Sequence, residues 1–252
     1  MRRPRHHLAD DRGFTLVELL VALSAGIVVL FGATSLIIVS FHFSSRIADS
    51  VNAVQEGRTA MEQLLQELNS GCLVNDVSPV QATTAAGITP AVNTDGNDLV
   101  FVTGLGDSAT ATPTEHVIAI QNGALIDTAY PNTGGSPPAL NTPATWTFSA
   151  TPKLRRILLE RVTQINGSTP LFQYLSFANA SNPTANSLVN AAPLSPLPLT
   201  AVAAPSVAEV DIAWQAGPSD GLTDPTRALA IRDSAVFRLT PASPTGTNYP
   251  CD

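Results

Sequence analysis

The chain is poor in cysteine, histidine and positive charge. Its 252 residues include two cysteines, four histidines, and 13 Lys and Arg against 20 Asp and Glu. The few Cys and His residues do not match the ligand spacing of zinc motifs, so we expect no bound metal and no cofactor. Phosphate binding depends on clustered Lys and Arg, so we also expect no direct binding of nucleic acid.

Sequence motifs of common enzyme classes are also missing. There is no P-loop, which excludes a P-loop nucleoside triphosphatase. There is no Gly-x-Ser-x-Gly elbow, and residues 104–108 are typical of a turn-rich loop. Asp95, Asn97 and Asp98 lack the rest of a calcium-loop pattern and predict a hydrogen-bonded turn. His116 stands alone in an expected strand. We therefore expect that the protein is not an enzyme.

The N-terminal part, in contrast, contains one long apolar run. Residues 14–43 carry a single formal charge, Glu18. About 20 apolar residues cross a bilayer as a helix, so this run predicts a transmembrane segment. An ionised acid at the centre of such a helix costs roughly 2.5–3.5 kcal/mol. A chain that needed only an anchor would avoid that cost, so Glu18 indicates a partner met later, in an assembly.

The residues before this run are rich in positive charge. Four arginines and two aspartates precede it: Arg2, Arg3, Arg5, Arg12, Asp10 and Asp11. This excess predicts a cytoplasmic N-terminus, with everything after about residue 44 outside the cytoplasm. A secretory signal cut near residues 24–26 is one alternative, but its apolar core would span only about 7–15 residues. A plain single-span anchor is another alternative, and it leaves Glu18 unexplained.

The start of the apolar run resembles a known processing signal. Residues 13–21 read Gly13-Phe14-Thr15-Leu16-Val17-Glu18-Leu19-Leu20-Val21 and resemble the N-terminal signature of type IV pilins and type II secretion pseudopilins. The resemblance covers about residues 10–40. It implies that a prepilin peptidase cuts after Gly13 and that Phe14 is then N-methylated. It also implies that Glu18 neutralises the terminal amine of a neighbouring subunit and sets register in a filament.

The same resemblance implies partners and a location. The partners are the prepilin peptidase and methyltransferase, other pilin or pseudopilin subunits, a membrane assembly platform and the lipid bilayer. The chain would first be a single-pass protein of the cytoplasmic membrane and later part of a filament. Loss of residues 1–13 would leave 239 residues with nine basic and eighteen acidic side chains, a net charge of −9.

The helix is expected to continue beyond the membrane. Apolar residues recur at spacings of three, four or seven and predict an amphipathic continuation over residues 44–70: Ile47, Val51, Val54, Met61, Leu65 and Leu68. Asn69-Ser70-Gly71 supplies a stop signal. The expected organisation is thus a leader at 1–13, a transmembrane or filament-core helix at 14–43, its amphipathic continuation, and an extracytoplasmic β-rich domain at 71–252.

Short apolar runs separated by turns predict the strands of that domain. Asn122-Gly123 predicts a hairpin turn between strands at 115–120 and 124–126. Further strands are expected at 99–102, 145–149, 154–163, 171–177, 207–214 and 228–239, with long loops at 132–142 and 179–205. The expected fold class is α+β, a long N-terminal helix packed on a mostly antiparallel sheet.

A second, more diffuse resemblance concerns the type of subunit. Residues 58–65, 171–174, 207–212 and 234–239 resemble larger minor pilins and J-type pseudopilins. This implies a position near a filament tip or in an initiating complex. A membrane-tethered binding protein, adhesin or enzyme outside any filament is the alternative. The sequence does not separate pilus, secretion pseudopilus and DNA-uptake systems.

Two smaller features are the cysteine pair and a basic cluster. A disulfide between Cys72 and Cys251 would close a loop of about 180 residues and add on the order of 5 kcal/mol in the chain-entropy model. Two free thiols are the alternative. The basic cluster Lys153, Arg155, Arg156 and Arg161 is interpreted as a solvated sheet face rather than a binding patch, with Arg156 on the side opposite to the others if the strand is unbroken.

Overall fold

The computed structural model describes residues 15–71, 78–104, 112–135, 145–176, 192–217 and 229–237. The chain divides into two compact units, residues 1–48 and residues 49–252. One helix, α1 (Leu16–Asn69), begins in the first unit and ends in the second. The fold class is α+β, as predicted, because the remaining regular structure consists almost entirely of antiparallel strands.

Both ends of α1 have identifiable signals. Thr15 precedes the helix, and its Oγ1 accepts a hydrogen bond of 3.3 Å from the amide of Glu18. A hydroxyl that receives the third amide of a helix is an N-cap, which replaces one of the missing backbone bonds. At the other end, the amide of Gly71 donates to the carbonyl of Leu68. The observed bounds agree with the predicted helix that ends at about Asn69.

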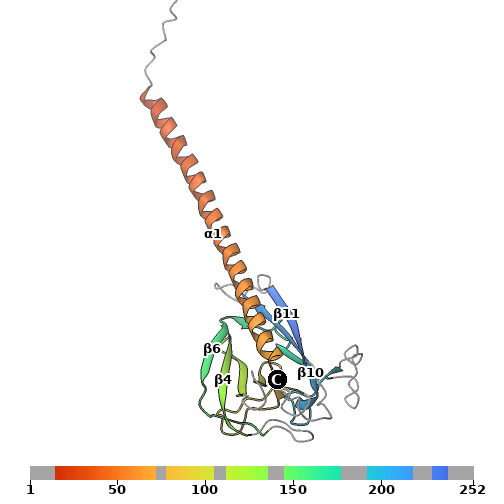
Figure 1. Cartoon of the computed structure of the whole chain (residues 1–252). Helices are drawn as coiled ribbons and strands as arrows, with labels where there is room; N and C mark the ends of the chain where they lie inside the picture. The colour runs from red at the N-terminus through yellow and green to blue at the C-terminus, as the bar shows by residue number, and fades with distance from the viewer. Residues whose placement is uncertain are drawn as a thin grey trace, which may run out of the picture. The chain divides into compact units, whose positions relative to one another are not determined.

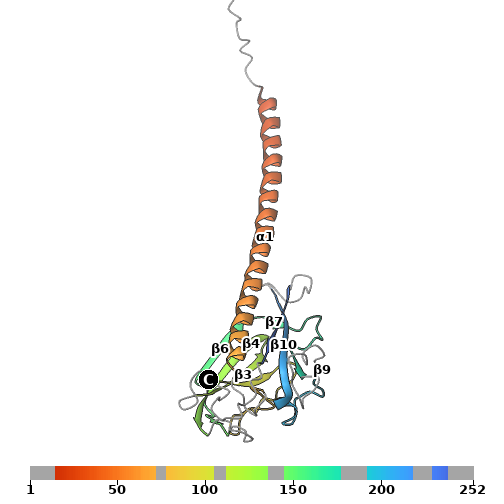
Figure 2. The same ribbon diagram turned by 45° about the vertical axis from the view of Figure 1, so that its right-hand side comes forward.

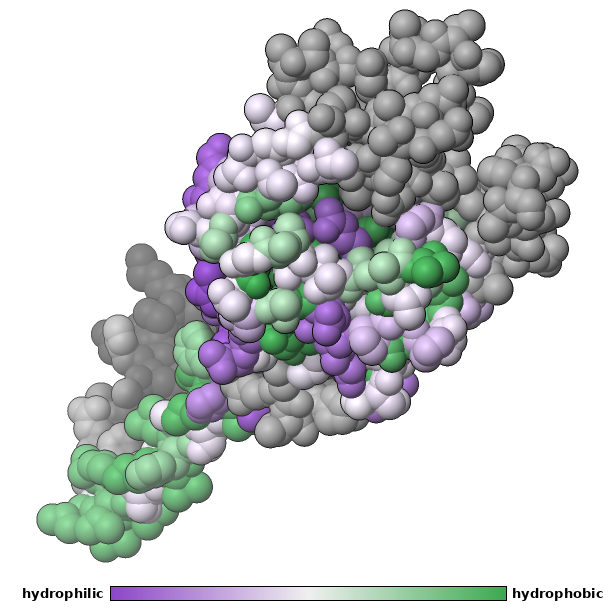
Figure 3. Space-filling view, turned by 90° about the horizontal axis from the view of Figure 1, so that it is seen from below, coloured by the Kyte–Doolittle hydropathy of each residue, from purple (hydrophilic) through white to green (hydrophobic). Residues whose placement is uncertain are grey.

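The first unit contains the apolar part of α1. Every described residue from Thr15 to Ala48 is exposed, and the most hydrophobic window of the helix is long enough and apolar enough to cross a membrane. None of that window is buried within the protein. In Figure 3 this part of the chain is coloured almost continuously as hydrophobic.

The second unit contains two antiparallel sheets. The first has the order β1-β2-β3-β4-β5, and β6 also pairs with β4. Its strands are β1 (Val80–Gln81), β2 (Leu99–Thr103), β3 (Thr114–Gln121), β4 (Ala124–Gly134), β5 (Thr147–Phe148) and β6 (Leu154–Leu159). The second sheet has the order β11-β10-β8-β9, and β7 pairs with β10. Its strands are β7 (Val162–Thr163), β8 (Phe172–Ser176), β9 (Ala192–Pro193), β10 (Val207–Ala216) and β11 (Leu229–Val236); a short 3-10 helix, η2 (Ala204–Ser206), precedes β10.

The β3–β4 hairpin follows directly from its turn residues. Asn122 and Gly123 have φ values of 54° and 77°. Two successive positive φ values are the requirement of a type I′ turn, which Asn-Gly satisfies with little strain. The turn fixes the register from Gln121 opposite Ala124 to Thr114 opposite Pro131. The hairpin agrees with the prediction, although β4 is longer than expected and includes Asn132 to Gly134.

The core lies between the last turns of α1 and both sheets. Figure 1 shows β4 and β6 on one side of these turns and β10 on the other, and in Figure 2 β6 and β10 again lie on opposite sides of them. The largest fully buried side chains include Trp214, Tyr174, Phe101 and Phe172, and they belong to one cluster with Leu64 and Leu68 of the helix. The helix therefore fills the space between two sheets rather than covering one.

The predicted apolar stripe of the helix is partly wrong. Met61 and Leu68 are buried as expected, but Val51 remains 48% exposed. The buried face is instead made of Ala53, Gly57, Ala60, Met61, Leu64 and Leu68. Small residues occupy this face because the strands of the second sheet approach the helix closely there. A Cβ on Gly57 would lie 2.4 Å from Cδ1 of Ile231 and 3.0 Å from Cβ of Ala216.

Two other expectations need correction. The segment 154–163 is not one unbroken strand, since β6 pairs with β4 of the first sheet and β7 with β10 of the second. The break lets the chain cross from one sheet to the other. Within the expected loop 179–205, Ala192 and Pro193 pair with β8. Proline is tolerated there because β9 lies at the edge of its sheet, where an amide need not be donated.

Candidate functional site

The residues of the expected processing signal lie at the start of α1. Gly13 and Phe14 fall outside the described residues, and the helix begins at Leu16. Glu18 occupies the first turn and is exposed. A carboxylate in a first turn faces the positive end of the helix dipole. Thr15 and Glu18 also have the spacing of a capping box, in which the threonine accepts a hydrogen bond from the amide of the glutamate.

The capping role of Thr15 goes beyond the expectations from the sequence, although its signal is present there. Threonine three residues before a glutamate, at the start of an apolar run, is a known start pattern for helices. The first turn thus has a second role besides the expected pairing of Glu18. The Thr15 cap fixes the first residue of the helix, just after the expected cleavage position.

The helix offers an extended apolar surface after this first turn. Its large side chains are mostly half or more exposed, for example Leu16 at 79%, Phe31 at 72% and Phe41 at 72%. Leaving such a side chain in water costs about 1.5–3 kcal/mol relative to burial. Contiguous exposed apolar surface of this size marks contact with a membrane or with other proteins.

A buried polar cluster joins the end of α1 to the first sheet. Asp127 on β4 is fully buried, and its Oδ1 lies 2.9 Å from Nδ1 of His116 on β3. Asp127 Oδ2 accepts a hydrogen bond of 3.0 Å from Nε of Arg156 on β6. The guanidinium of Arg156 also contacts Oε1 of Glu67, in the last turns of the helix. The second oxygen of Glu67 lies 3.5 Å from His116 Nδ1.

The sequence alone does not indicate this cluster, because its members lie far apart along the chain. The members are separated by up to 89 residues and come from one helix and three strands. Only the side of the sheet on which each residue lies can be inferred. Arg156 does lie opposite to Arg155, as the alternation predicts, because Arg155 is exposed and Arg156 is half-buried. Lys153 is exposed as well, and Arg161 is partly buried.

Two other carboxyl groups have a changed acidity. Burial raises the pKa of Glu115 to about 7, and hydrogen bonds from the amide of Ala85 oppose this shift. Burial, together with the charge of Asp95, raises the pKa of Asp98 to about 6. Asp95 Oδ1 accepts hydrogen bonds from the amides of Asn97 and Asp98. The predicted hydrogen-bonded turn at 95–98 is therefore present. The backbone carbonyls of Asp95 and Asp98 also accept hydrogen bonds from the hydroxyl of the buried Tyr174.

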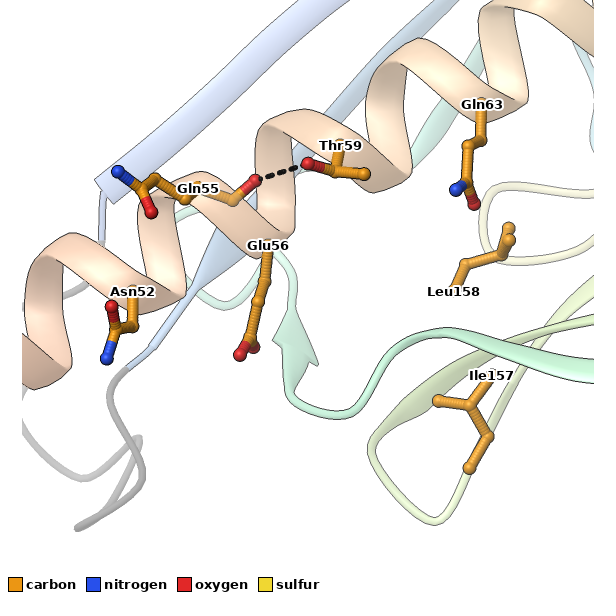
Figure 4. Close-up of a pocket in the computed structure, with 7 residues that line it drawn as sticks. All are labelled: Asn52, Gln55, Glu56, Thr59, Gln63, Ile157 and Leu158. Carbon is orange, nitrogen blue, oxygen red and sulfur yellow. Dashed lines mark hydrogen bonds between the residues drawn. The ribbon is translucent and has the colours of Figure 1, made fainter.

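A shallow groove of about 390 Å³ lies between the second half of α1 and β6. Figure 4 shows Glu56 and Gln63 projecting from the helix toward the side on which Ile157 and Leu158 lie. Asn52, Gln55 and Thr59 complete the lining, and the hydroxyl of Thr59 is used within the helix, on the carbonyl of Gln55. Glu56 is the one ionisable residue in this lining, so the groove has no acid–base pair for catalysis.

The two cysteines lie outside the described residues, and the disulfide between Cys72 and Cys251 stays a prediction.

Comparison with known proteins gives one result, at the N-terminus. The model of the family described as "Prokaryotic N-terminal methylation motif" matches residues 8–34. No curated protein and no solved structure matches the chain. The match spans the end of the expected leader, the expected cleavage position, Thr15, Glu18 and the larger part of the apolar run. The chain therefore carries a prepilin-type N-terminal signal, and this signal supports its assignment to the pilin and pseudopilin family.

Proposed function

We propose that this protein is a minor subunit of a type IV pilus or of a filament like that of type II secretion. It is inserted into the cytoplasmic membrane, trimmed after Gly13 and N-methylated on Phe14. It is then moved by a separate assembly platform into a filament. The β-rich unit selects partners. The protein is a substrate of the processing enzyme and has no catalytic activity of its own.

One observation carries this proposal: the unburied apolar part of α1 lies largely within a methylation motif and keeps a single carboxylate, Glu18. None of the apolar window is buried within the protein. Lipid can cover it before assembly, and the helices of other subunits can cover it afterwards. Lipid does not compensate the charge of Glu18, which costs free energy within an apolar segment. A neighbouring N-terminal amine does, since an opposite charge compensates the carboxylate where water is excluded.

The size of the β-rich unit supports a minor rather than a major position. It forms from residues 49–252 and contains two sheets. A bulky unit is harder to repeat along a closely packed helical shaft than to place once at a tip. We therefore propose a position at or near the filament tip.

The test replaces Glu18 and measures incorporation into filaments. Glu18→Ala removes the carboxylate, and Glu18→Gln removes only its charge. Both variants should reach the membrane in normal amount, and both should be reduced at least tenfold in sheared filament fractions. Ser24→Ala is the matched control, because the Ser24 hydroxyl bonds within the helix, to the carbonyl of Val21. Normal incorporation of Glu18→Ala would contradict the proposed pairing of Glu18 with a neighbouring amine.

A further inference from the structure

The cluster around Asp127 contains two carboxylates whose oxygens are divided between two neighbours. Arg156 contacts one oxygen of each carboxylate. Its Nε donates to Asp127 Oδ2, and its Nη2 contacts Glu67 Oε1. The other two oxygens, Asp127 Oδ1 and Glu67 Oε2, both face Nδ1 of His116, at 2.9 Å and 3.5 Å. Three possible metal ligands from α1, β3 and β4 thus converge, with their ligand atoms within 4.8 Å of one another.

The hydrogen bonds of this cluster leave one carboxylate oxygen without a donor. Nδ1 of an imidazole carries at most one hydrogen, and the shorter contact to Asp127 uses it. Glu67 Oε2 is buried and has no hydrogen-bond partner among the described residues. A buried acceptor without a donor is costly, and more so when it carries charge. The cluster contains two carboxylates and one guanidinium, and a cation between the three ligand atoms would contact the carboxylate oxygen that has no donor.

We propose that Glu67, His116 and Asp127 bind a divalent transition-metal ion, and that zinc fits best. Zinc prefers nitrogen and carboxylate oxygen ligands at about 2.0–2.2 Å in a tetrahedral arrangement, which separates neighbouring ligand atoms by roughly 3.3 Å. The observed separations from His116 Nδ1, 2.9 Å and 3.5 Å, lie on either side of this value. A calcium ion would favour a larger set of oxygen ligands and no imidazole.

Arg156 is compatible with this site because it bonds the outer oxygens only. Hydrogen bonds to the outer oxygen of a ligating carboxylate fix the direction of the inner oxygen and are a common support of metal sites. Arg156 is therefore a positioning residue. A water molecule can serve as the fourth ligand.

The bound ion would connect the end of the helix to the first sheet. Glu67 belongs to the last turns of α1, His116 to β3 and Asp127 to β4. An ion that binds only the folded protein stabilises it in proportion to the logarithm of its concentration above the dissociation constant. Zinc should thus make the β-rich unit resistant to unfolding without any part in filament chemistry.

The test uses the untagged full-length protein in detergent, first stripped with a chelator. His6 and His7 are changed to Asn in all samples, because adjacent histidines near the terminus can bind zinc themselves. The melting temperature is measured with and without a moderate excess of zinc. Zinc should raise it by at least about 3 °C in this parent protein. Glu67→Gln and His116→Gln should lose most of the shift, whereas Glu62→Gln, an exposed residue of the same helix, should keep it.

Cobalt provides a second readout that does not depend on the folding of variants. Cobalt bound in place of zinc should give visible absorption typical of four-coordinate sites, and one equivalent of zinc should remove it. The proposal is wrong if the parent shows neither a zinc-dependent shift nor a displaceable cobalt spectrum. It is also wrong if the shift is the same in the parent, Glu67→Gln and His116→Gln.

Discussion

Glu115 is a buried carboxyl group on β3 whose effect on stability depends on pH. Its side chain accepts hydrogen bonds of 3.0 Å and 3.3 Å from the amide of Ala85, and so attaches the segment after β1 to the sheet. Burial raises its pKa from 4.5 to about 7. The folded state therefore holds a proton that the unfolded state releases at lower pH. Burial, together with the charge of Glu115, also raises the pKa of Tyr130.

This difference makes the folded protein less stable as the pH rises. Below about pH 4.5 the group is protonated in both states and has no pH-dependent effect. Between pH 4.5 and about 7 the folded state binds more protons than the unfolded state, so the free energy of unfolding falls. Above about pH 7 the full cost of the buried charge is present. Asp98, with a pKa of about 6, also lowers the free energy of unfolding as the pH rises.

Replacement of Glu115 by Gln should remove one of these two contributions. We expect Glu115→Gln to have a higher melting temperature than the parent at about pH 8 and nearly the same melting temperature at about pH 5. Gln still offers one oxygen to the amide of Ala85. The control is Glu160→Gln, which changes an exposed residue and should leave the pH profile unchanged. A Glu115→Gln protein that loses stability equally at both pH values would contradict the assignment.

At the level of secondary structure, the contact between α1 and the second sheet depends on Gly57. A glycine in the middle of a helix normally costs about 1 kcal/mol relative to alanine. Here the backbone of the helix lies so close to β10 and β11 that a Cβ would meet Ala216 and Ile231. The close packing of α1 against β10 and β11 compensates the lower helix propensity of glycine at this position.

Gly57→Ala should therefore destabilise the β-rich unit by about 1–2 kcal/mol, in spite of the better helix propensity of alanine. Ile231→Val removes the Cδ1 atom that lies closest to the new methyl group. In the Gly57→Ala background this second change should restore part of the lost stability, as a double-mutant cycle of chemical unfolding would measure. Gly32→Ala is the control, because no atom lies within 4 Å of the position that a Cβ would take there. A neutral or stabilising effect of Gly57→Ala alone would show that the close contact is absent.

Strands and turns are largely predictable because their signals are local. The Asn122-Gly123 turn, the alternation along β6 and the stop after Asn69 each depend on a few neighbouring residues. The division of residues 154–163 into β6 and β7 is not predictable, because it depends on which of the two sheets each part of the segment joins. The buried face of α1 differs from the prediction for a related reason. Periodicity favours the large residues Val51 and Val54, whereas the close approach of β10 and β11 favours small ones, Ala53, Gly57 and Ala60.

For the molecule as a whole, the N-terminal motif and the buried polar cluster differ in how far the sequence predicts them. The motif that includes Gly13, Phe14 and Glu18 is a linear pattern, so the sequence contains it completely. The cluster of Glu67, His116, Asp127 and Arg156 exists only after folding brings one helix and three strands together. A lone histidine in a strand gives no reason to expect it.

The two units also divide the proposed function. Every residue of the apolar helix at 15–48 is exposed, and this surface needs a cover of lipid or of neighbouring helices. The unit of residues 49–252 has its own core and buried polar contacts. In the proposed function, the processing signal and the apolar helix bring this β-rich unit to a filament, and the surface of the unit determines its position there.

The most direct test of this account is mass spectrometry of the N-terminus of the protein recovered from membranes of its native host. The account predicts a chain that begins at Phe14 and carries one additional methyl group on its terminal amine. Gly13→Ser, expressed in the same host, should retain residues 1–13 and lack the methyl group. A native protein that retains residues 1–13, or that begins at another residue without methylation, would contradict the assignment as a processed filament subunit.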